Sequence, residues 1–357
     1  MKITRYCKIL PGHPGGECLT EAAVILRWGG TVAFPTETVY GLGANALNPA
    51  AVAKIFAAKG RPSDNPLIVH IACLDDLDML VSRIPPAVEL LVQAFWPGPL
   101  TLVLPKRPGV PDVVTAGLDT VGVRMPAHPV ALALLEKSRV PVAAPSANLS
   151  GRPSPTTGLH VLKDLAGKVD LVLDAGECQV GVESTVLDLT TNPPMILRPG
   201  GITKEELEEV IGPVALDPAL SGEASQDFKP KAPGMKYTHY APKAKVTVVV
   251  GLTAAGLFTL SRLVQEARDR GLRVGLLLTA ETARAYRERR LAQPHYLEVL
   301  GSQYHLEEIA SRLYGALRNC DRYRLDVVYA EGVPPKGLGL AIMNRLTKAA
   351  GRRILRV

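Results

Sequence analysis

The sequence predicts an α/β protein with two domains, the first built on a mixed, twisted sheet and the second, smaller one on a parallel sheet. Its 357 residues suit two domains rather than one. Residues 1–212 alternate helix and strand patterns with strands in excess, whereas residues 244–357 alternate short apolar strands with helices. Between them, residues 213–243 lack periodicity and are rich in Pro, Gly, Ala and Ser, which predicts a linker or a lid.

The first domain is expected to contain three helices, where apolar residues recur at helical spacing next to Gly or Pro stop and start signals. These helices are predicted at residues 18–29, 49–61 and 204–212. Short apolar runs indicate strands, the first of them turning at Pro35. The strands are predicted at residues 30–38, 65–72, 101–106, 121–126, 141–148, 170–176, 184–189 and 195–200.

In the second domain, predicted buried strands and amphipathic helices alternate more regularly, which is typical of a doubly wound parallel sheet. Strands are predicted at residues 245–251, 272–279, 325–333 and 353–357. Helices are predicted at residues 253–271, 281–291, 303–319 and 337–351.

Composition indicates a soluble, cytoplasmic protein. Apolar residues make up 47% and charged residues 21% of the chain, as in ordinary globular proteins. No stretch approaches the roughly 18 apolar residues of a membrane span, and the first residues do not resemble a secretory signal. The five cysteines are scattered without a C-x-x-C pair, so we expect free thiols rather than a disulfide framework or a zinc site.

The net charge of +7 is unevenly distributed along the chain. Residues 1–212 hold 18 Lys and Arg against 21 Asp and Glu, and residues 240–357 hold 20 against 10. A basic C-terminal third could meet nucleic acid or an acidic partner, or could be a solvated Arg-rich face. Direct binding of nucleic acid has no second signal in the sequence, since no aromatic platform for base stacking is apparent.

Familiar nucleotide-binding and hydrolase motifs are absent, including G-x-x-x-x-G-K-[ST], H-E-x-x-H and G-x-S-x-G. Polar residues instead gather at predicted element ends, where sites form. Residues 35–43 place Thr36, Glu37 and Thr38 beside a Gly-rich turn, which suits either a site or a capped helix start. Residues 59–70 place Lys59 and Arg61 around a helix-ending Gly, which suits a polyphosphate or the negative helix end.

Four further clusters follow strands in the same way, at residues 119–126, 143–151, 183–185 and 198–201. Arg124 lies in an apolar strand, so it needs an anionic partner, either a ligand carboxylate or a neighbouring acid. Small residues around Ala144 would allow a ligand to approach closely, although a plain turn would need them too. No single cluster decides the function.

Taken in order, these clusters resemble one family, the threonylcarbamoyl-AMP synthases with a YrdC-like domain. The resemblance rests on PTETVYGLGANA, the K-x-R of Lys59 and Arg61, NPLIVH, VGVRMP, the S-x-N of Ser146 and Asn148, ESTV and LRPG, which together span about residues 15–212. The continuation APGMKYTHYAP at 232–242 is similar to the longer members, which carry a Rossmann-like C-terminal domain.

The resemblance implies a basic cavity for L-threonine and ATP. By similarity, the threonine-binding residues are Thr38, His70, Arg124, Ala144 and Ser184, with Thr36 as an alternative to Thr38. The ATP-binding residues by similarity are Lys59, Arg61, Asn65, Thr120, Ser146, Asn148, Ser154, Arg198 and Tyr237. Lys59 and Arg61 are the expected catalytic cations, and both are expected to flank a turn rather than to fill a core.

The resemblance also implies the reaction, in which L-threonine, bicarbonate and ATP give threonylcarbamoyl-AMP, pyrophosphate and water. The product would pass to a tRNA threonylcarbamoyltransferase. The protein itself would bind no metal, and Mg²⁺ would be carried by ATP. The linker is expected to fold over the cavity and exclude water from a labile carbamate.

Three other functions remain to be weighed against this one. A nucleic-acid-binding module would explain the basic C-terminal third. A carbamoyltransferase-type maturation enzyme shares the YrdC-like fold, but such chains carry zinc-finger segments and this chain has no C-x-x-C. A regulatory nucleotide sensor in the C-terminal domain could coexist with an enzyme.

Overall fold

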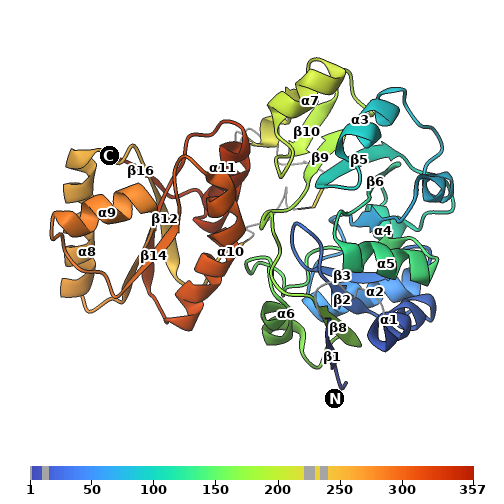
Figure 1. The fold of residues 1–357 in the computed structure, drawn as a ribbon, viewed down its shortest axis with the longest axis horizontal. Helices are drawn as coiled ribbons and strands as arrows, with labels where there is room; N and C mark the ends of the chain where they lie inside the picture. The colour runs from blue at the N-terminus through green and yellow to red at the C-terminus, as the bar shows by residue number, and fades with distance from the viewer. Residues whose placement is uncertain (1, 10–15, 221–229, 234–239) are drawn as a thin grey trace. The chain divides into compact units, whose positions relative to one another are not determined.

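The computed structural model describes residues 2–9, 16–220, 230–233 and 240–357 (Figure 1). Its contacts divide the chain into two compact units. The first unit comprises Met1–Ser150 with Ser154–Tyr237, and the second comprises Gly151–Pro153 with Thr238–Val357. The predicted boundaries at 212 and 243 stay a prediction.

Within the described residues, the first unit is built on one eleven-stranded mixed sheet. Pairs such as β4 with β6 are parallel, whereas β7 is antiparallel to both of its neighbours. In order across the sheet, the strands are β1 (Arg5–Lys8), β8 (Leu171–Asp174), β2 (Val32–Phe34), β3 (Gly41–Asn45), β7 (Val142–Ala143), β4 (Ile68–His70), β6 (Thr120–Arg124), β5 (Leu100–Pro105), β9 (Thr185–Asp188), β10 (Met195–Arg198) and β11 (Ala215–Leu216).

Helices connect these strands and cover the sheet (Figure 1). Several begin at side-chain caps: Asn48 caps α2, Thr157 caps α6, and Thr203 forms a capping box on α7. The helices are α1 (Glu17–Arg27), α2 (Pro49–Lys59), η1 (Leu74–Met79), α3 (Ala87–Phe95), α4 (Asp112–Thr115), α5 (Pro129–Ser138), α6 (Gly158–Leu165), α7 (Lys204–Ile211) and η2 (Pro218–Leu220).

The two faces of the sheet are covered differently. Alternate strand residues such as Val69, Leu102 and Leu187 point to one face, where they share a core with residues of α2, α3, α6 and α7. On the opposite face, the β1–β8–β2 half packs against α1 and α5. The β4–β6–β5–β9–β10 half of that face carries only a small apolar cluster.

That small cluster is completed by a short piece of the linker. Ala232 is fully buried, with 0% of its surface exposed, and shares the cluster with Ile68, Val103, Val186 and Leu197. Next to it, Lys231 pairs with the buried Asp188 at 3.0 Å. The linker therefore packs on this part of the sheet. Among the described residues, no helix of the first unit contributes to the cluster.

The second unit holds a five-stranded sheet in which every pair is parallel. Its helices α8 and α9 lie on one face and α10 and α11 on the other (Figure 1). The strands in order across the sheet are β14 (Tyr296–Gly301), β13 (Val274–Thr279), β15 (Val327–Glu331), β12 (Lys245–Val250) and β16 (Ile354–Arg356). The helices are α8 (Ala254–Asp269), α9 (Ala280–Glu288), α10 (Leu306–Arg322) and α11 (Leu338–Ala349).

The expected fold class is confirmed: a mixed sheet with helices precedes a parallel α/β unit. Every helix and strand that the sequence predicted has a counterpart, although β7 is much shorter than residues 141–148. Elements that were not predicted are the helices α3 to α6, η1 and η2 and the strands β1, β3, β11 and β14. Of these helices, α5 is apolar on more than one side, so its periodicity is weak, whereas the apolar residues of α3 and α6 do recur at helical spacing.

The expectation that all cysteines are free is wrong for two of them. Cys7 of β1 and Cys18 of α1 form a disulfide, with Cα atoms 6.2 Å apart. The pairing joins residues separated by 11 positions, a spacing that no cysteine motif signals. Cys73, Cys178 and Cys320 are free.

Replacing Ala232 with Leu should destabilise the first unit by about 1–3 kcal/mol, because a fully enclosed methyl group leaves no room for a larger side chain. Both tryptophans, Trp28 and Trp96, lie in this unit, so urea unfolding followed by tryptophan fluorescence reports on it. The matched control is Ala50→Leu, at an exposed position of α2. Equal midpoints for the two variants would show that the linker does not pack on the sheet.

Candidate functional site

The site begins where two parallel strands end side by side. In β4 and β6, His70 is the register partner of Arg124, and both side chains are buried. On its other side, His70 is the register partner of Val142 in β7. Because paired residues point to the same face, His70 and Arg124 lie on the face that carries Ala232 and its cluster.

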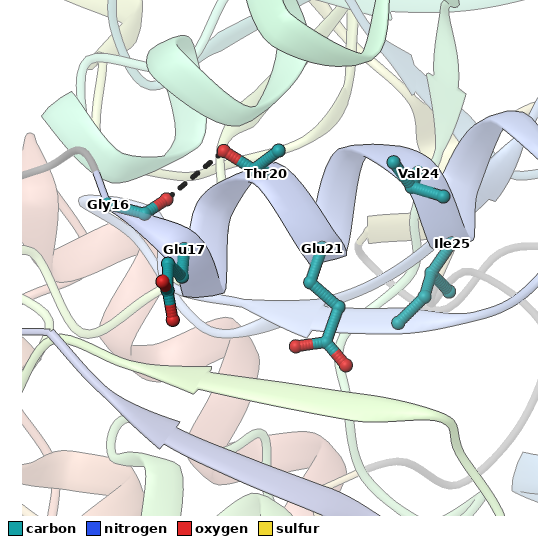
Figure 2. Close-up of a pocket in the computed structure, with 6 residues that line it drawn as sticks. All are labelled: Gly16, Glu17, Thr20, Glu21, Val24 and Ile25. Carbon is teal, nitrogen blue, oxygen red and sulfur yellow. Dashed lines mark hydrogen bonds between the residues drawn. The ribbon is translucent and has the colours of Figure 1, made fainter.

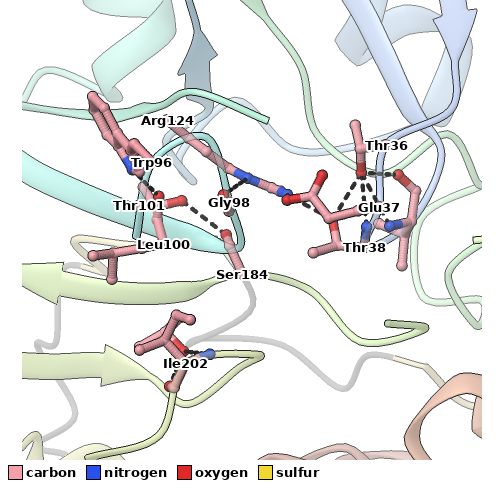
Figure 3. A network of polar contacts seen from close by, with 12 residues as sticks. Thr36, Glu37, Thr38, Trp96, Gly98, Leu100, Thr101, Arg124, Ser184 and Ile202 are labelled. Atoms are coloured by element: carbon pink, nitrogen blue, oxygen red, sulfur yellow. Dashed lines mark hydrogen bonds and ion pairs between the residues drawn. The ribbon is translucent and has the colours of Figure 1, made fainter. Parts of the chain in front are cut away.

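Arg124 is a buried charge, 3% exposed, and it joins three segments of the chain (Figure 3). Its Nη2 forms an ion pair with Glu37 Oε1. Its Nη1 donates to Thr38 Oγ1 at 2.9 Å, and its Nε donates to the Gly98 carbonyl at 3.0 Å. Of the two alternatives that the sequence left open, the neighbouring acid is therefore present, and two of the five guanidinium N–H groups have no bond to the described residues.

The Thr36–Thr38 turn between β2 and β3 is fixed by its own side chains. Thr36 Oγ1 lies 2.8 Å from Thr38 Oγ1 and accepts from the amides of Thr38 and Val39, both at 3.2 Å. Thr36 therefore shapes the turn, whereas Thr38 faces Arg124. This arrangement supports Thr38 over Thr36 as the residue that would contact a ligand.

A third hydroxyl group joins the site from the start of β9. Ser184 Oγ lies 2.8 Å from Thr101 Oγ1 of β5 (Figure 3). It also accepts from Arg198 Nη2 at 3.1 Å. Arg198 also donates to the Ser184 carbonyl and, at 3.3 Å, to the Pro233 carbonyl of the linker. Arg198 thus ties the linker to the same serine.

Lys59 is buried, whereas the sequence led us to expect that it flanks a turn rather than fills a core. It ends α2 with only 3% of its surface exposed, because its Nζ reaches across to a loop. There Nζ donates to the carbonyl oxygens of Ser146 and Asn148, the latter at 2.7 Å. The interpretation that Lys59 merely flanks a turn is wrong, since its ammonium group holds the S-x-N loop in place.

The S-x-N loop lies beside the start of β3. Ser146 bridges to Gly41 at the start of β3, and its Oγ donates to Asn148 Oδ1 at 2.5 Å. Ala144, just after β7, uses its amide to bond the Ile68 carbonyl at 2.9 Å. Ala144 therefore lies opposite Ile68, two positions before His70 on β4.

The remaining predicted residues lie farther out. Arg61 Nη2 bonds the carbonyls of Asn65 and Pro66, both at 3.2 Å. Ser154 is fully buried and donates to Glu183 Oε1 at 2.6 Å. Thr120 begins β6, so it lies on the same face as Arg124 but at the other end of the strand. Tyr237, together with Lys236 and His239 of the expected lid, lies outside the described residues.

Three buried side-chain atoms of this region have no hydrogen-bond partner among the described residues. They are Glu37 Oε2, Asn65 Oδ1 and His70 Nδ1. A buried polar atom without a partner costs about 1–3 kcal/mol, so folded proteins rarely keep one without a reason such as a ligand. Asn65 precedes β4 and His70 ends it, whereas Glu37 lies in the turn after β2. The pairing of β4 with β6 brings His70 to Arg124, which binds Glu37.

His70 is held neutral by its surroundings. Burial, followed by the positive charge of Arg124, lowers the pKa of His70 to about 3. Its ring also meets Phe34 edge-on, with centroids 6.1 Å apart. At neutral pH the imidazole can therefore act as a hydrogen-bonding group without adding positive charge to the site.

Sequence reasoning missed the partners that orient the predicted residues. Glu37, Thr101 and the Gly98 carbonyl were assigned no role, although Glu37 was noted within the first cluster. The signal for Glu37 was the isolated carboxylate beside Thr38, together with an arginine in an apolar strand. Thr101 and Gly98 carry no such signal, since their contacts depend on the strand order.

Other features of the first unit show less chemistry. A surface hollow along α1 is lined by Gly16, Glu17, Thr20, Glu21, Val24 and Ile25 (Figure 2). Its polar groups come from one helix, and Thr20 turns back to the Gly16 carbonyl. Nor does any helix in the described part of the chain have the length and apolar character to span a membrane.

Comparison with known families gives two adjoining matches. Residues 24–200 match the Sua5/YciO/YrdC family, described as telomere recombination. Residues 202–351 match a second family, described as the C-terminal domain of threonylcarbamoyl-AMP synthase. Apart from residues 151–153, the first match lies within the first unit, and the second covers the end of that unit and most of the second unit.

Individual relatives cover nearly the whole chain. Threonylcarbamoyl-AMP synthase of Pyrococcus abyssi is 52% identical over 94% of this chain and 95% of its own length. The Bacillus subtilis protein of that name is 51% identical, over 95% of this chain and 94% of the relative. The crystal structure of P. abyssi Sua5 complexed with L-threonine superposes with a TM-score of 0.91 at 50% identity, covering 99% of this chain and all of that one. The chain belongs to the threonylcarbamoyl-AMP synthase family.

Stability should fall more steeply with acid in the wild type than in a His70→Asn variant. A folded-state pKa near 3 lies below the unfolded value of about 6.5, so the unfolded chain binds a proton first as the pH falls. Between about pH 6 and pH 4 the difference should grow by about 1.4 kcal/mol per pH unit. Urea unfolding at several pH values measures it, and pH 8 sets the structural cost of the replacement. Parallel profiles would show that His70 is accessible to protons in the folded state.

Removing Arg124 alone should be more damaging than removing the whole ion pair. Arg124→Met leaves the Glu37 carboxylate buried without its partner, which should cost about 3–5 kcal/mol. The double variant Glu37→Gln/Arg124→Met should be more stable than Arg124→Met. Tryptophan-monitored urea unfolding of the single and double variants measures the coupling. Strictly additive losses would show that the two charges do not depend on each other.

Proposed function

We propose that this chain is an L-threonylcarbamoyladenylate synthase, which converts L-threonine, bicarbonate and ATP into threonylcarbamoyl-AMP, pyrophosphate and water. The observation that carries the proposal is the pair of buried unpartnered atoms on Glu37 and His70, both beside Arg124, together with the hydroxyl groups of Thr38 and Ser184. Such a site is prepared for a small polar ligand with charged groups. The family of the chain and the threonine complex of its P. abyssi relative give that ligand a chemical identity.

Threonine would lie over the carboxyl ends of β4 and β6. Its carboxylate would accept hydrogen bonds from the two remaining N–H groups of Arg124. Glu37 already balances part of the positive charge of this guanidinium. The unpartnered His70 Nδ1 would bond a polar group of the amino acid. Because the imidazole is neutral, it would not repel the positively charged amino group of threonine. Thr38, Ser184 and the backbone at Ala144 would complete the subsite.

ATP would lie toward the S-x-N loop. Arg61 offers the planar cation that suits phosphate oxygens, and Asn65 has an unpartnered oxygen for a donor on the nucleotide. Ser146, Asn148, Ser154, Thr120 and Arg198 would supply further polar contacts, and Tyr237 would add one from the linker. The buried Lys59 would act mainly by holding the loop, since its ammonium group already bonds two carbonyl oxygens.

The reaction needs positioning more than covalent catalysis. The threonine amine would attack bicarbonate or its carbon dioxide to form a carbamate, with loss of water. A carbamate oxygen would then attack the α-phosphorus of ATP, and pyrophosphate would leave. Fixed cations beside the triphosphate would stabilise the charge that develops.

A magnesium ion would arrive with the nucleotide. Within the described ranges, no group of three or more His, Cys, Asp or Glu side chains is placed to hold a metal. Mg²⁺ commonly keeps its waters and binds substrate phosphates, where it neutralises charge on the triphosphate. The protein residues named above would then contact the nucleotide rather than the ion.

The linker would serve as a lid over this face. Ala232 packs beside the site, and Arg198 bonds the carbonyls of both Pro233 and Ser184, so this described piece of the linker is tied to the site. A cover at this place would exclude water from the carbamate. The product would pass to a tRNA threonylcarbamoyltransferase, and the enzyme would work in the cytoplasm.

Pyrophosphate release from ATP should require both L-threonine and bicarbonate. Labelled bicarbonate should appear in threonylcarbamoyl-AMP by mass spectrometry of the reaction. Serine should react more slowly by a factor equivalent to about 1–3 kcal/mol, because it lacks one methyl group. ATP hydrolysis at an equal rate without threonine would refute the assignment.

A matched pair of arginines tests the nucleotide subsite in that assay. Arg61→Ala should raise the KM for ATP more than the KM for threonine. Arg83→Ala, at an exposed position of the same unit, should change neither. Equal effects of the two replacements would exclude Arg61 from the nucleotide subsite.

A further inference from the structure

The second unit carries its positive charge at one edge of its sheet. Because all pairs are parallel, the five strands begin at the same edge, which we call the amino edge. Of the 20 Lys and Arg in residues 240–357, thirteen lie in the segments that enter the strands, against four Asp and Glu, a net charge of +9. These segments are residues 242–245, 268–273, 287–295, 321–326 and 348–353.

The opposite edge has the opposite sign. Residues at and beyond the strand ends, in 251–253, 279–282, 302–308, 331–338 and 356–357, hold two Lys and Arg against four Asp and Glu, a net charge of −2. The basic character of this unit is therefore not a general property of its surface. It belongs to one edge.

The segments of the amino edge contact one another, so their charges form one surface. The Lys245 amide bonds the Asp326 carbonyl, and the Asp326 amide bonds the Arg273 carbonyl, both at 2.8 Å. The Lys243 amide bonds Asp321 Oδ1 at 2.7 Å. Arg353 Nε bonds the Val246 carbonyl at 3.0 Å.

Helix ends explain only part of this charge. Each of α8 to α11 has one cation in its last turn, where it offsets the helix dipole, namely Arg268, Arg287, Arg322 and Lys348. The other nine lie beyond the helices, and all nine are exposed: Lys243, Lys245, Arg270, Arg273, Arg289, Arg290, Arg324, Arg352 and Arg353. Like charges gathered in this way repel one another. A polyanionic partner bound at this edge would offset that repulsion.

The predominance of arginine over lysine indicates which class of anionic partner this edge would bind. Ten of the thirteen are arginines, whose planar forks match phosphate oxygens and stack on aromatic rings. An acidic protein surface would be satisfied by lysine as well. The amino edge is therefore better suited to a phosphate backbone than to a row of carboxylates.

An aromatic pair lies at the same edge, although the sequence analysis found no such platform. Tyr296 begins β14 and Tyr323 follows α10, and their rings stack with centroids 4.2 Å apart at 25°. Tyr323 remains 40% exposed, and the Arg322 guanidinium lies 5.9 Å from its ring centroid. A stacked tyrosine with an adjacent arginine can accept an unpaired nucleobase.

We propose that the amino edge of the second unit binds RNA through an unpaired stretch, with phosphates on the exposed arginines and a base on Tyr323. The charge and the tyrosine pair carry the choice of a nucleic acid with unpaired bases. The choice of RNA over DNA rests on the proposed function, whose product serves tRNA modification. The surface belongs to the second unit and uses no residue of the threonine or ATP subsites.

The test uses the full chain and a fluorescein-labelled RNA hairpin with a seven-nucleotide loop, followed by fluorescence anisotropy at several salt concentrations. Arg289→Glu/Arg290→Glu should weaken binding at least tenfold and reduce the slope of log affinity against log salt by about 1.5 to 2. The matched control is Lys336→Glu/Arg356→Glu, the same charge change at the opposite edge, which should stay within twofold of the wild type. Equal losses from both pairs would overturn the assignment to the amino edge.

Two further comparisons test the base contact. Tyr323→Ala should weaken hairpin binding about tenfold and leave binding to a fully paired RNA duplex unchanged, whereas Tyr323→Phe should retain hairpin binding. Identical hairpin and duplex affinities would overturn the unpaired-base contact, and equal affinity for a DNA hairpin would overturn the choice of RNA. Adenylate synthesis without RNA, measured on the same variants, should stay at the wild-type rate. If the wild type and all variants lack adenylate synthesis but the wild type still binds RNA, the proposed function is refuted and the RNA-binding proposal is not.

Discussion

The buried charge of Arg124 is the constraint on which the first unit depends. A guanidinium at the end of an apolar strand is tolerated only where its N–H groups find acceptors. Those acceptors come from the turn after β2, through Glu37 and Thr38, and from the chain before β5, through the Gly98 carbonyl. One side chain thus fixes three segments, and the residue that organises the site also leaves two donors for a ligand.

The uneven covering of the sheet explains why the site lies where it does. Helices α1 and α5 cover one half of the face that carries His70 and Arg124, and in the described part of the linker Ala232 packs on the other half. Polar side chains can therefore remain on this face between two apolar clusters. Arg198 contacts both Ser184 and the Pro233 carbonyl, so the linker and the site share one arginine.

Local patterns in the sequence predicted the fold class and most of the polar residues of the site, because strand ends with Thr, Arg or Asn are visible without a structure. What they could not supply is the strand order. Only the neighbouring positions of β4, β6 and β7 bring His70 to Arg124, and only the pairing of β5 with β9 brings Thr101 to Ser184. The burial of Lys59 and the Cys7–Cys18 disulfide likewise depend on where distant segments meet.

The parallel sheet of the second unit also makes that unit an electric dipole. A six-residue strand spans about 20 Å, and charges of opposite sign gather at its two ends. The four helices run against the strands, so their own dipoles oppose this separation but are too small to cancel it. In the field of a polyanion the unit would turn its positive end forward before contact, which speeds association at low ionic strength. At physiological salt, with a Debye length of about 8 Å, the effect would act only at close approach.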